Sequence, residues 1–234
     1  MFLKKMAFQK LPFRLQVQLF RAFKLNYFKD LYSDKNIVFI HVPKAAGTSI
    51  NSALYGVPQT SHLKAKDFKR YNPDVFNNAY SFAVLRNPWD RLISAYEFAR
   101  SGGSEIRYHR AKLKEKMLSR DFRYFLESLQ DLDLQELDPV FWLQSDFVLG
   151  VDGNLLVNHC GKVESLSDTI ACLKRETGVE LQLENRNSSQ RESLDQYYSQ
   201  DICVEIVANI YRSDIELGAY SFDALSKVSA VSRR

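Results

Sequence analysis

The order of apolar and polar segments along the chain predicts strands that alternate with helices. Continuous apolar runs at residues 37–40 and 80–85 are typical of strands buried in a parallel sheet. A helical segment follows each run: residues 47–54 after the first, and a helix from Asn87-Pro88 after the second. Asn suits the N-cap of that helix and Pro its first position. The pattern predicts an α/β domain with a central, mainly parallel sheet flanked by helices.

Two helical stripes indicate further core-facing surfaces. In the helix after Pro88 the apolar residues recur at helical spacing; they are Trp89, Leu92, Ile93, Tyr96 and Ala99. A charged, helical segment at residues 105–135 contains a second stripe, formed by Phe122, Phe125, Leu126 and Leu129. In contrast, residues 57–79 are polar and contain Pro58 and Pro73, so irregular structure is expected there.

The second half of the chain has weaker signals. Residues 147–150 and 155–157 flank Val151-Asp-Gly-Asn154, a turn sequence that predicts a β-hairpin. Residues 162–164 predict one more short strand. We expect Ser167 to cap a helix that ends at Gly178. A last helix is expected over residues 199–217, with Ile202, Ile206, Ile210 and Leu217 on its buried face.

Length and composition predict one main domain. The chain has 234 residues, of which 45% are hydrophobic and 26% charged, as is ordinary for a globular domain. We expect residues 1–34 to form a basic amphipathic helical extension, residues 35–225 the main domain and residues 226–234 a flexible tail. A helix packed on the domain is the commoner form of such an extension, and contact of residues 1–30 with an anionic membrane surface is the alternative.

Charge and cysteine content bear on the type of ligand and on the cellular compartment. The net charge of +4 fits an anionic ligand, but a solvated basic surface explains it equally well. The cysteines are odd in number and form no C-x-x-C pair, which disfavours a disulfide framework or a zinc site; they are Cys160, Cys172 and Cys203. No apolar run approaches the about 20 residues of a membrane span, and no signal peptide is evident. We therefore expect a cytoplasmic protein.

The loop after the first predicted strand has the composition of an anion-binding site. Val42-Pro-Lys-Ala-Ala-Gly-Thr-Ser49 provides backbone N–H groups at a helix N-terminus, two hydroxyls and one cation. The loop lacks the first glycine of a Walker A motif, and its Lys precedes the Gly. Arg86, rather than an acidic metal ligand, follows the second strand. We therefore expect a phosphate-like group whose charge is neutralised by Lys44 without a metal ion.

A second candidate segment is Leu85-Arg-Asn-Pro-Trp-Asp-Arg-Leu-Ile-Ser-Ala-Tyr96. Arg86 is expected at the carboxyl edge of the sheet, where open α/β folds bind ligands. Together with Ser94, it has the groups needed to bind a second phosphate. Arg91 either assists or forms a structural ion pair. Taken alone, the segment is more typical of a capped helix with solvated arginines.

Together, the two segments resemble the sulfotransferases that use 3′-phosphoadenosine 5′-phosphosulfate (PAPS), with a likeness to the heparan sulfate 2-O-sulfotransferases and chondroitin sulfotransferases. The resemblance implies a P-loop-like nucleotide-binding fold and PAPS as the donor. It implies that Arg86 and Ser94 bind the 3′-phosphate. It also implies that the 5′-phosphosulfate is held by Lys44, Ala45, Ala46, Gly47, Thr48 and Ser49.

The resemblance extends over residues 35–222. Later segments similar to the family are Phe141-Trp-Leu-Gln-Ser145, Val163-Glu-Ser-Leu166 and residues 211–220. By the same analogy, residues 187–191 close over the nucleotide, and Arg191 contributes to its binding.

The resemblance also implies a catalytic base. An acceptor hydroxyl or amine must lose a proton, and histidine is suited to accept it near neutral pH. His62 lies between the two nucleotide segments, where some carbohydrate sulfotransferases have their catalytic histidine. Lys44 would stabilise the charge on the leaving oxygen. Alternative bases are Glu97, Glu105 and Glu164. No role is assigned to the other histidines, which are His41, His109 and His159.

The acceptor is expected to be a glycan or a lipid-linked saccharide, and no nucleic acid is expected as a partner. Basic residues after His62 could line a groove for an acidic glycan, although such a run is more often a solvated face; they are Lys64, Lys66, Lys69 and Arg70. Two other functions stay open at this point: a divergent P-loop kinase or NTPase, and a non-catalytic nucleotide- or glycan-binding protein.

Overall fold

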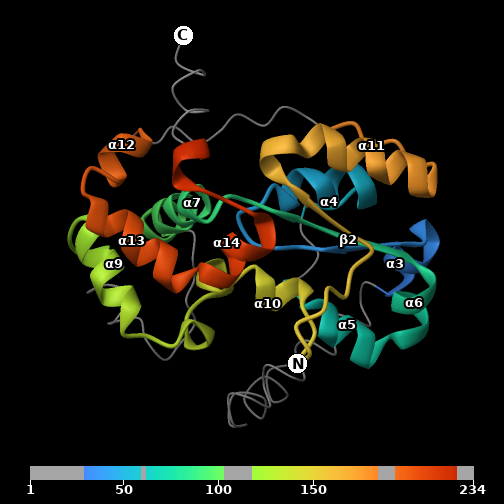
Figure 1. Cartoon of the computed structure of the whole chain (residues 1–234). Coiled ribbons are helices and arrows are strands. Elements are labelled where there is room, and N and C mark those ends of the chain that lie inside the picture. The colour runs from blue at the N-terminus through green and yellow to red at the C-terminus, as the bar shows by residue number, and fades with distance from the viewer. Residues whose placement is uncertain (1–28, 59–61, 103–117, 184–192, 226–234) are drawn as a thin grey trace.

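A three-stranded parallel sheet forms the centre of the described structure. The computed structural model describes residues 29–58, 62–102, 118–183 and 193–225 (Figure 1). In this part of the chain the strand order is β1 (Ile37–Ile40), β2 (Tyr80–Leu85), β3 (His159–Lys162). All four residues of β1 are buried, as their continuous apolar run predicts. The predicted α/β fold with a central parallel sheet is confirmed.

Helices cover the sheet. In the view of Figure 1, α4 (Gly47–Tyr55) and α11 (Leu166–Thr177) lie above the strands, and α5 (Ala65–Tyr71), α6 (Pro73–Asn78) and α10 (Ser145–Val148) lie below them. Helix α3 (Lys29–Lys35) packs against β1 and α6. Its Tyr32 is 1% exposed and belongs to the core around the sheet.

A second hydrophobic core joins α7 (Pro88–Arg100), α9 (Phe122–Gln130) and α13 (Asp201–Ile210), at the left of Figure 1. The N-cap of α7 is as predicted: the Asn87 side chain accepts the N–H of Trp89 at 3.2 Å. Both predicted apolar stripes, on α7 and α9, are buried. Helix α12 (Leu194–Tyr197) also contributes to this core.

Within residues 57–79, the prediction of irregular structure was wrong for residues 65–71 and 73–78, which form α5 and α6. Pro73 starts α6 instead of interrupting a helix, because the first-turn N–H groups of a helix need no intrahelical partner. The composition of this segment concealed two short helices that bury Phe68 and Phe76 against the sheet.

The predicted hairpin is present only as a short antiparallel pairing around its turn, where the N–H of Gly150 donates to the carbonyl of Asn154 at 2.8 Å and that of Leu156 to the carbonyl of Val148 at 2.9 Å. A single antiparallel bridge joins Leu149 to Leu155 around the turn, and the residues before it form α10. The strand expected at residues 162–164 lies earlier, as β3, and a 3₁₀ helix follows it, η3 (Val163–Ser165). Helix α11 starts at Leu166, ahead of the expected cap Ser167, and it ends at Thr177 with the predicted Gly178 as its C-cap.

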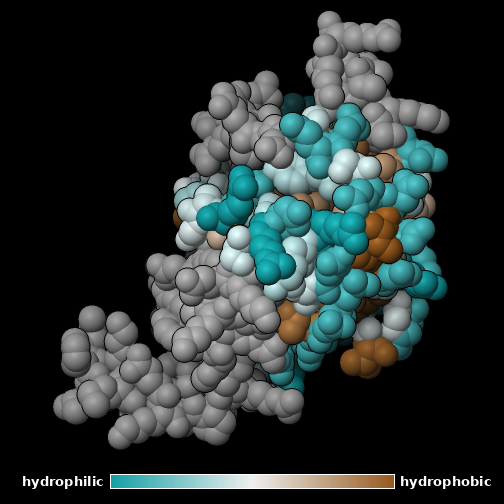
Figure 2. All heavy atoms as spheres, turned by 90° about the vertical axis from the view of Figure 1, so that its left-hand side faces the viewer, coloured by the Kyte–Doolittle hydropathy of each residue, from teal (hydrophilic) through white to brown (hydrophobic). Residues whose placement is uncertain are grey.

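The last helix is divided at Tyr211 into α13 and α14 (Arg212–Gly218). At this junction Tyr211 has a φ of −105° and a ψ of 27°, and its hydroxyl donates to the carbonyl of Phe141 at 2.8 Å. Ile202, expected on the buried face, is 42% exposed. In the view of Figure 2, onto the side of α9 and α13, the described surface is largely hydrophilic with scattered hydrophobic groups.

Within the described residues, β1 is an edge strand, and a side chain covers part of its outer edge. The Tyr55 hydroxyl accepts the N–H of Phe39 at 3.0 Å and donates to the carbonyl of Ile37 at 2.9 Å. These two backbone groups point away from β2, so the hydroxyl takes the place of a neighbouring strand. The end of α4 is thereby fixed against β1, and α4 begins at the candidate anion loop.

Within the described residues, none of the helices is both long and apolar enough to cross a membrane. Of the predicted helical extension at residues 1–34, residues 29–34 belong to α3, and residues 1–28 lie outside the described residues, as does the predicted tail at 226–234.

Candidate active site

The loop between β1 and α4 has an unusual backbone. Lys44 and Ala46 have φ values of 67° and 59°, in the left-handed region that disfavours residues with a Cβ. Each such residue costs on the order of 1 kcal/mol, so the surrounding structure must hold the loop in this form. Ala46 is the N-cap of α4 and provides no side-chain acceptor for the first N–H groups of the helix.

Two arginines hold the loop by its carbonyl groups. Arg91 is buried and donates from Nε to the carbonyl of Pro43 at 2.9 Å and from a terminal nitrogen to that of Val140 at 3.1 Å. Arg86 donates to the carbonyl of Lys44 at 3.1 Å. The expectation that Arg91 assists or forms an ion pair is thus replaced by these carbonyl contacts. They explain how the strained loop is maintained.

Arg86 itself is fixed at the carboxyl edge of β2, where the sequence places it. Its guanidinium forms an ion pair with Asp90 at 2.6 Å. Its main-chain N–H and carbonyl are bound by the Gln144 side-chain amide, at 2.9 and 2.8 Å. The next residue, Asn87, donates its N–H to Glu164 at 2.6 Å. Both Gln144 and Glu164 belong to segments with a family resemblance, and the structure brings them to the end of β2.

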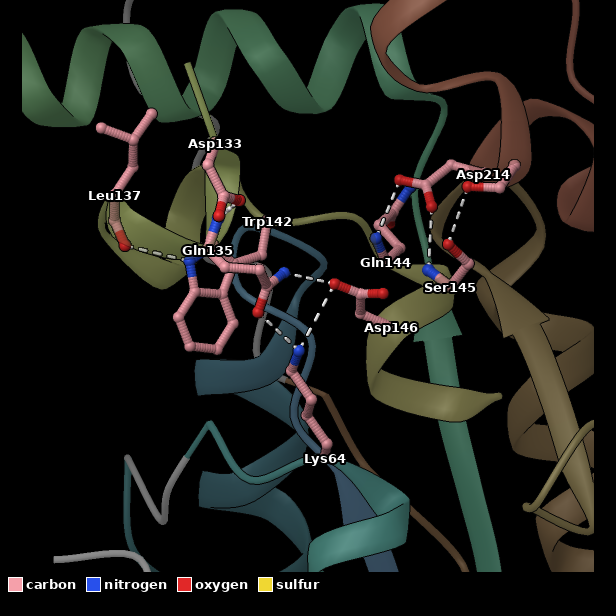
Figure 3. Close-up of polar contacts among 10 residues, drawn as sticks. Lys64, Asp133, Gln135, Leu137, Trp142, Gln144, Ser145, Asp146 and Asp214 are labelled. Atoms are coloured by element: carbon pink, nitrogen blue, oxygen red, sulfur yellow. Dashed lines mark hydrogen bonds and ion pairs between the residues drawn. The ribbon is translucent and has the colours of Figure 1, made fainter. Parts of the chain in front are cut away.

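A buried carboxylate joins this arrangement to the C-terminal segment. Asp214 is 0% exposed and accepts the N–H groups of Gln144 and Ser145, each at 2.8 Å (Figure 3). Burial raises the pKa of Asp214, whereas Arg91 and the two backbone donors oppose that rise. Asp214 had no place among the sequence candidates. The signal available in the sequence was its spacing: Asp214 lies four residues after Ile210 and three before Leu217, on the predicted apolar face of the last helix.

Lys44 directs its amino group over the ring of Phe98 on α7, 4.3 Å from the ring centroid. Burial lowers the pKa of Lys44, and the charges of Arg86 and Arg91 lower it further. An anion beside Lys44 would therefore relieve repulsion among three neighbouring cations.

His62 lies against the end of β1. Its Nδ1 donates to the carbonyl of His41 at 3.2 Å, and the centroids of the two imidazole rings are 4.4 Å apart. Burial lowers the pKa of His62. The structure thus places the predicted base next to the residue that precedes the anion loop.

The basic residue nearest to His62 is not part of a groove. Lys64 is 4% exposed, and its Nζ donates to Gln135 at 2.9 Å and pairs with Asp146 at 3.3 Å (Figure 3). Gln135 in turn donates to Asp146, and Nζ lies 4.6 Å from the ring centroid of Trp142. Lys64 therefore anchors the loop of His62 to η1 (Leu134–Glu136) and α10, and the groove prediction is wrong for this residue.

The remaining predicted residues vary in position. Thr48 is exposed, and Ala45 and Gly47 are buried, while Ser49 and Ser94 are partly buried. Arg191, Glu105 and His109 lie outside the described residues.

Two alternative bases have structural contacts. Glu97 accepts from the Tyr197 hydroxyl at 2.8 Å, and Glu164 binds Asn87. In the parts of the chain that the structure describes, no group of three or more His, Cys, Asp or Glu side chains has an arrangement that could hold a metal ion.

The donor set of the loop therefore fits an anion: helix N–H groups without a side-chain cap, a cationic amine and two hydroxyls.

A model of the family described as "Sulfotransferase family" matches residues 31–221. The comparison with curated proteins found no match, and the comparison with solved structures also found none.

Proposed function

The chain belongs to the sulfotransferase family, and we propose that it transfers the sulfuryl group of PAPS to a hydroxyl or amine of a carbohydrate acceptor. The observation that carries this proposal is the loop at residues 42–49. Its carbonyls are held by Arg86 and Arg91, and its helix N-terminus and Lys44 remain for an anion.

The proposed donor site has two anion subsites. Lys44 and the N–H groups of residues 45–49 bind the 5′-phosphosulfate, because a helix N-terminus and an ammonium together favour a concentrated negative charge. Arg86 and Ser94 bind the 3′-phosphate. The contacts of Arg86 to Asp90 and to the carbonyl of Lys44 support this role, since they fix its guanidinium at the sheet edge while it retains further N–H donors.

In the proposed reaction the acceptor oxygen or nitrogen forms a bond to sulfur while the bond from sulfur to the bridging phosphate oxygen breaks. Charge develops on that leaving oxygen, and the products are the sulfated acceptor and 3′-phosphoadenosine 5′-phosphate (PAP). Lys44 stabilises the leaving group, and the acceptor proton passes to His62. The lowered pKa of His62 supports this role, because the ring is then neutral and able to accept a proton at neutral pH.

Calorimetry with PAP and with ATP-Mg²⁺ tests the donor site. We expect PAP to bind and ATP-Mg²⁺ to bind at least about tenfold more weakly, since the loop lacks the Walker A pattern. The Lys44→Met variant should lose about 10²-fold in turnover, whereas Lys35→Met, at an exposed lysine of α3, should not change it. Tight binding of ATP without binding of PAP would contradict the proposal.

A screen of acceptors with PAPS tests the acceptor class. Neutral glycans, acidic glycans and lipid-linked saccharides are compared, with a simple phenol as a non-carbohydrate control. Mass spectrometry should detect a gain of about 80 Da, the mass of SO₃, on a carbohydrate. Sulfation of the phenol alone would refute a carbohydrate acceptor, and binding of PAP without any transfer would favour a non-catalytic protein.

A further inference from the structure

His41 connects the anion loop to the proposed base. It follows β1 directly, is 5% exposed and precedes the loop by one residue. Its main-chain carbonyl accepts the hydrogen bond from His62, and its ring lies 4.4 Å from the ring of His62. The ring of Phe39 also stacks on the His41 ring, with 5.9 Å between the ring centroids.

The hydrogen bonds fix both imidazoles in defined tautomers. A carbonyl can only accept, so the His62 nitrogen that contacts His41 carries a proton, and its Nε2 has the free lone pair. The Nδ1 of His41 lies 3.1 Å from Nδ2 of Asn51, an amide nitrogen that can only donate. Neutral His41 therefore carries its proton on Nε2. The two rings are in opposite tautomers.

The same ring occupies the space above the first residue of α4. A Cβ placed on Gly47 would lie 1.9 Å from both Cδ2 and Nε2 of His41. Gly47 is therefore required by the close approach of the imidazole. Since Asn51 is in the same helix and is 0% exposed, His41 is held between the side chain of Asn51 and the backbone of Gly47.

We propose that His41 is a positioning residue, which holds His62 with Nδ1 protonated and its Nε2 lone pair available to the acceptor proton. The inference rests on the proposed function only in assigning the base to His62. The carbonyl of His41 selects the tautomer of His62. The ring of His41 is fixed by Asn51 and Gly47, and it keeps the His62 ring within hydrogen-bond distance of that carbonyl.

The charges around His62 agree with a neutral base. Burial lowers its pKa, and Arg91 and Lys44 add to this effect, whereas the contact with the His41 carbonyl and the charge of Asp138 oppose it. The pKa of His41 is also lowered, by burial and then by His62, so His41 stays neutral beside its neighbour. Because the ring of His41 lies against that of His62, we expect its removal to expose His62 to water and to raise the pKa of His62 toward the ordinary value.

Nitrogen NMR of ¹⁵N-histidine-labelled protein tests the tautomers directly. The signals of His109 and His159 are assigned with His109→Gln and His159→Gln. In the wild-type protein at neutral pH we expect His62 protonated at Nδ1 and His41 protonated at Nε2. Protonation of neutral His62 at Nε2 would overturn the inference, whatever the turnover of the enzyme.

His41→Asn tests the positioning role. The new Asn retains an oxygen that can accept from the Asn51 amide, but it lacks the imidazole ring that packs against His62. We expect kcat to fall by at least about tenfold and PAP affinity to stay within about threefold. The acid limb of the kcat/KM profile should move to higher pH as the pKa of His62 rises. An unchanged kcat and an unchanged acid limb would refute the role.

Asn51→Leu provides a second test should His41→Asn not fold, because it frees the His41 ring and should also lower kcat while PAP still binds. His159→Gln is the matched control and should retain wild-type kinetics. Failure of wild-type protein to transfer sulfate would refute the proposed function alone, since the tautomers are read without turnover.

Discussion

Replacing Lys64 with Met tests whether the buried amine stabilises the fold. Met retains the apolar stem of the side chain but removes the hydrogen bond to Gln135, the ion pair with Asp146 and the contact with the Trp142 ring. A hydrogen bond that involves a charged group contributes roughly 1.5–3 kcal/mol, and a cation–π contact about 0.5–2 kcal/mol.

Two effects reduce the loss of unfolding free energy in Lys64→Met. Removing the ammonium relieves its own desolvation. The Asp146 side chain is 31% exposed, so water hydrates it once its partner is gone, and it still accepts from Gln135. The severe penalty of a buried, unpaired charge therefore does not apply. We expect Lys64→Met to lower the free energy of unfolding by about 2 kcal/mol.

Urea unfolding followed by circular dichroism measures this change. Lys66→Met is the control, because Lys66 is exposed on α5, the helix that follows Lys64, and should alter stability by no more than about 0.5 kcal/mol. A double-mutant cycle with Asp146→Asn isolates the coupling between the two charges. If Lys64→Met were as stable as Lys66→Met, the buried pair would contribute nothing, and the anchoring role of Lys64 would be refuted.

Three further predictions concern the loop and its surroundings. Gly47→Ala should weaken PAP binding measured by calorimetry, because the new Cβ would lie 1.9 Å from the His41 ring; unchanged binding would show that the ring moves freely. Arg91→Lys should lower both the unfolding free energy, by about 2 kcal/mol or more, and PAP affinity, because one amine cannot reproduce the two carbonyl contacts of the guanidinium. Burial raises the pKa of Cys160 to about 12, so its thiol is protonated at neutral pH. In folded protein at pH 8, mass spectrometry should find it alkylated much more slowly than in urea, and equal rates would contradict its burial.

Local patterns were sufficient for the elements that form the candidate site. The apolar runs of β1 and β2 and the Asn87-Pro88 cap are signals within a few residues, and they located the loop and Arg86 correctly. The prediction for α5 and α6 failed because such short helices with polar faces show no sustained hydrophobic periodicity. The packing of Phe68 and Phe76 against the core stabilises them as helices.

The supports of the site depend on contacts between distant residues. Asp214 binds the N–H groups of Gln144 and Ser145, about seventy positions earlier, and Lys64 binds Asp146, 82 positions away. Such pairs leave no periodic trace in one sequence, so Lys64 appeared to be a solvated cation. Likewise, only the three-dimensional contacts of His41 with Asn51 and His62 distinguish it from an ordinary residue at the end of a strand.

The hydroxyl of Tyr55 has a consequence for association between molecules. An edge strand with free N–H and carbonyl groups is a template on which another chain can add a strand. The Tyr55 hydroxyl already binds the carbonyl of Ile37 and the N–H of Phe39, so these two groups are not available to a strand from a second copy. A single phenol in the helix that begins at the anion loop thus also blocks the addition of a strand at this part of β1.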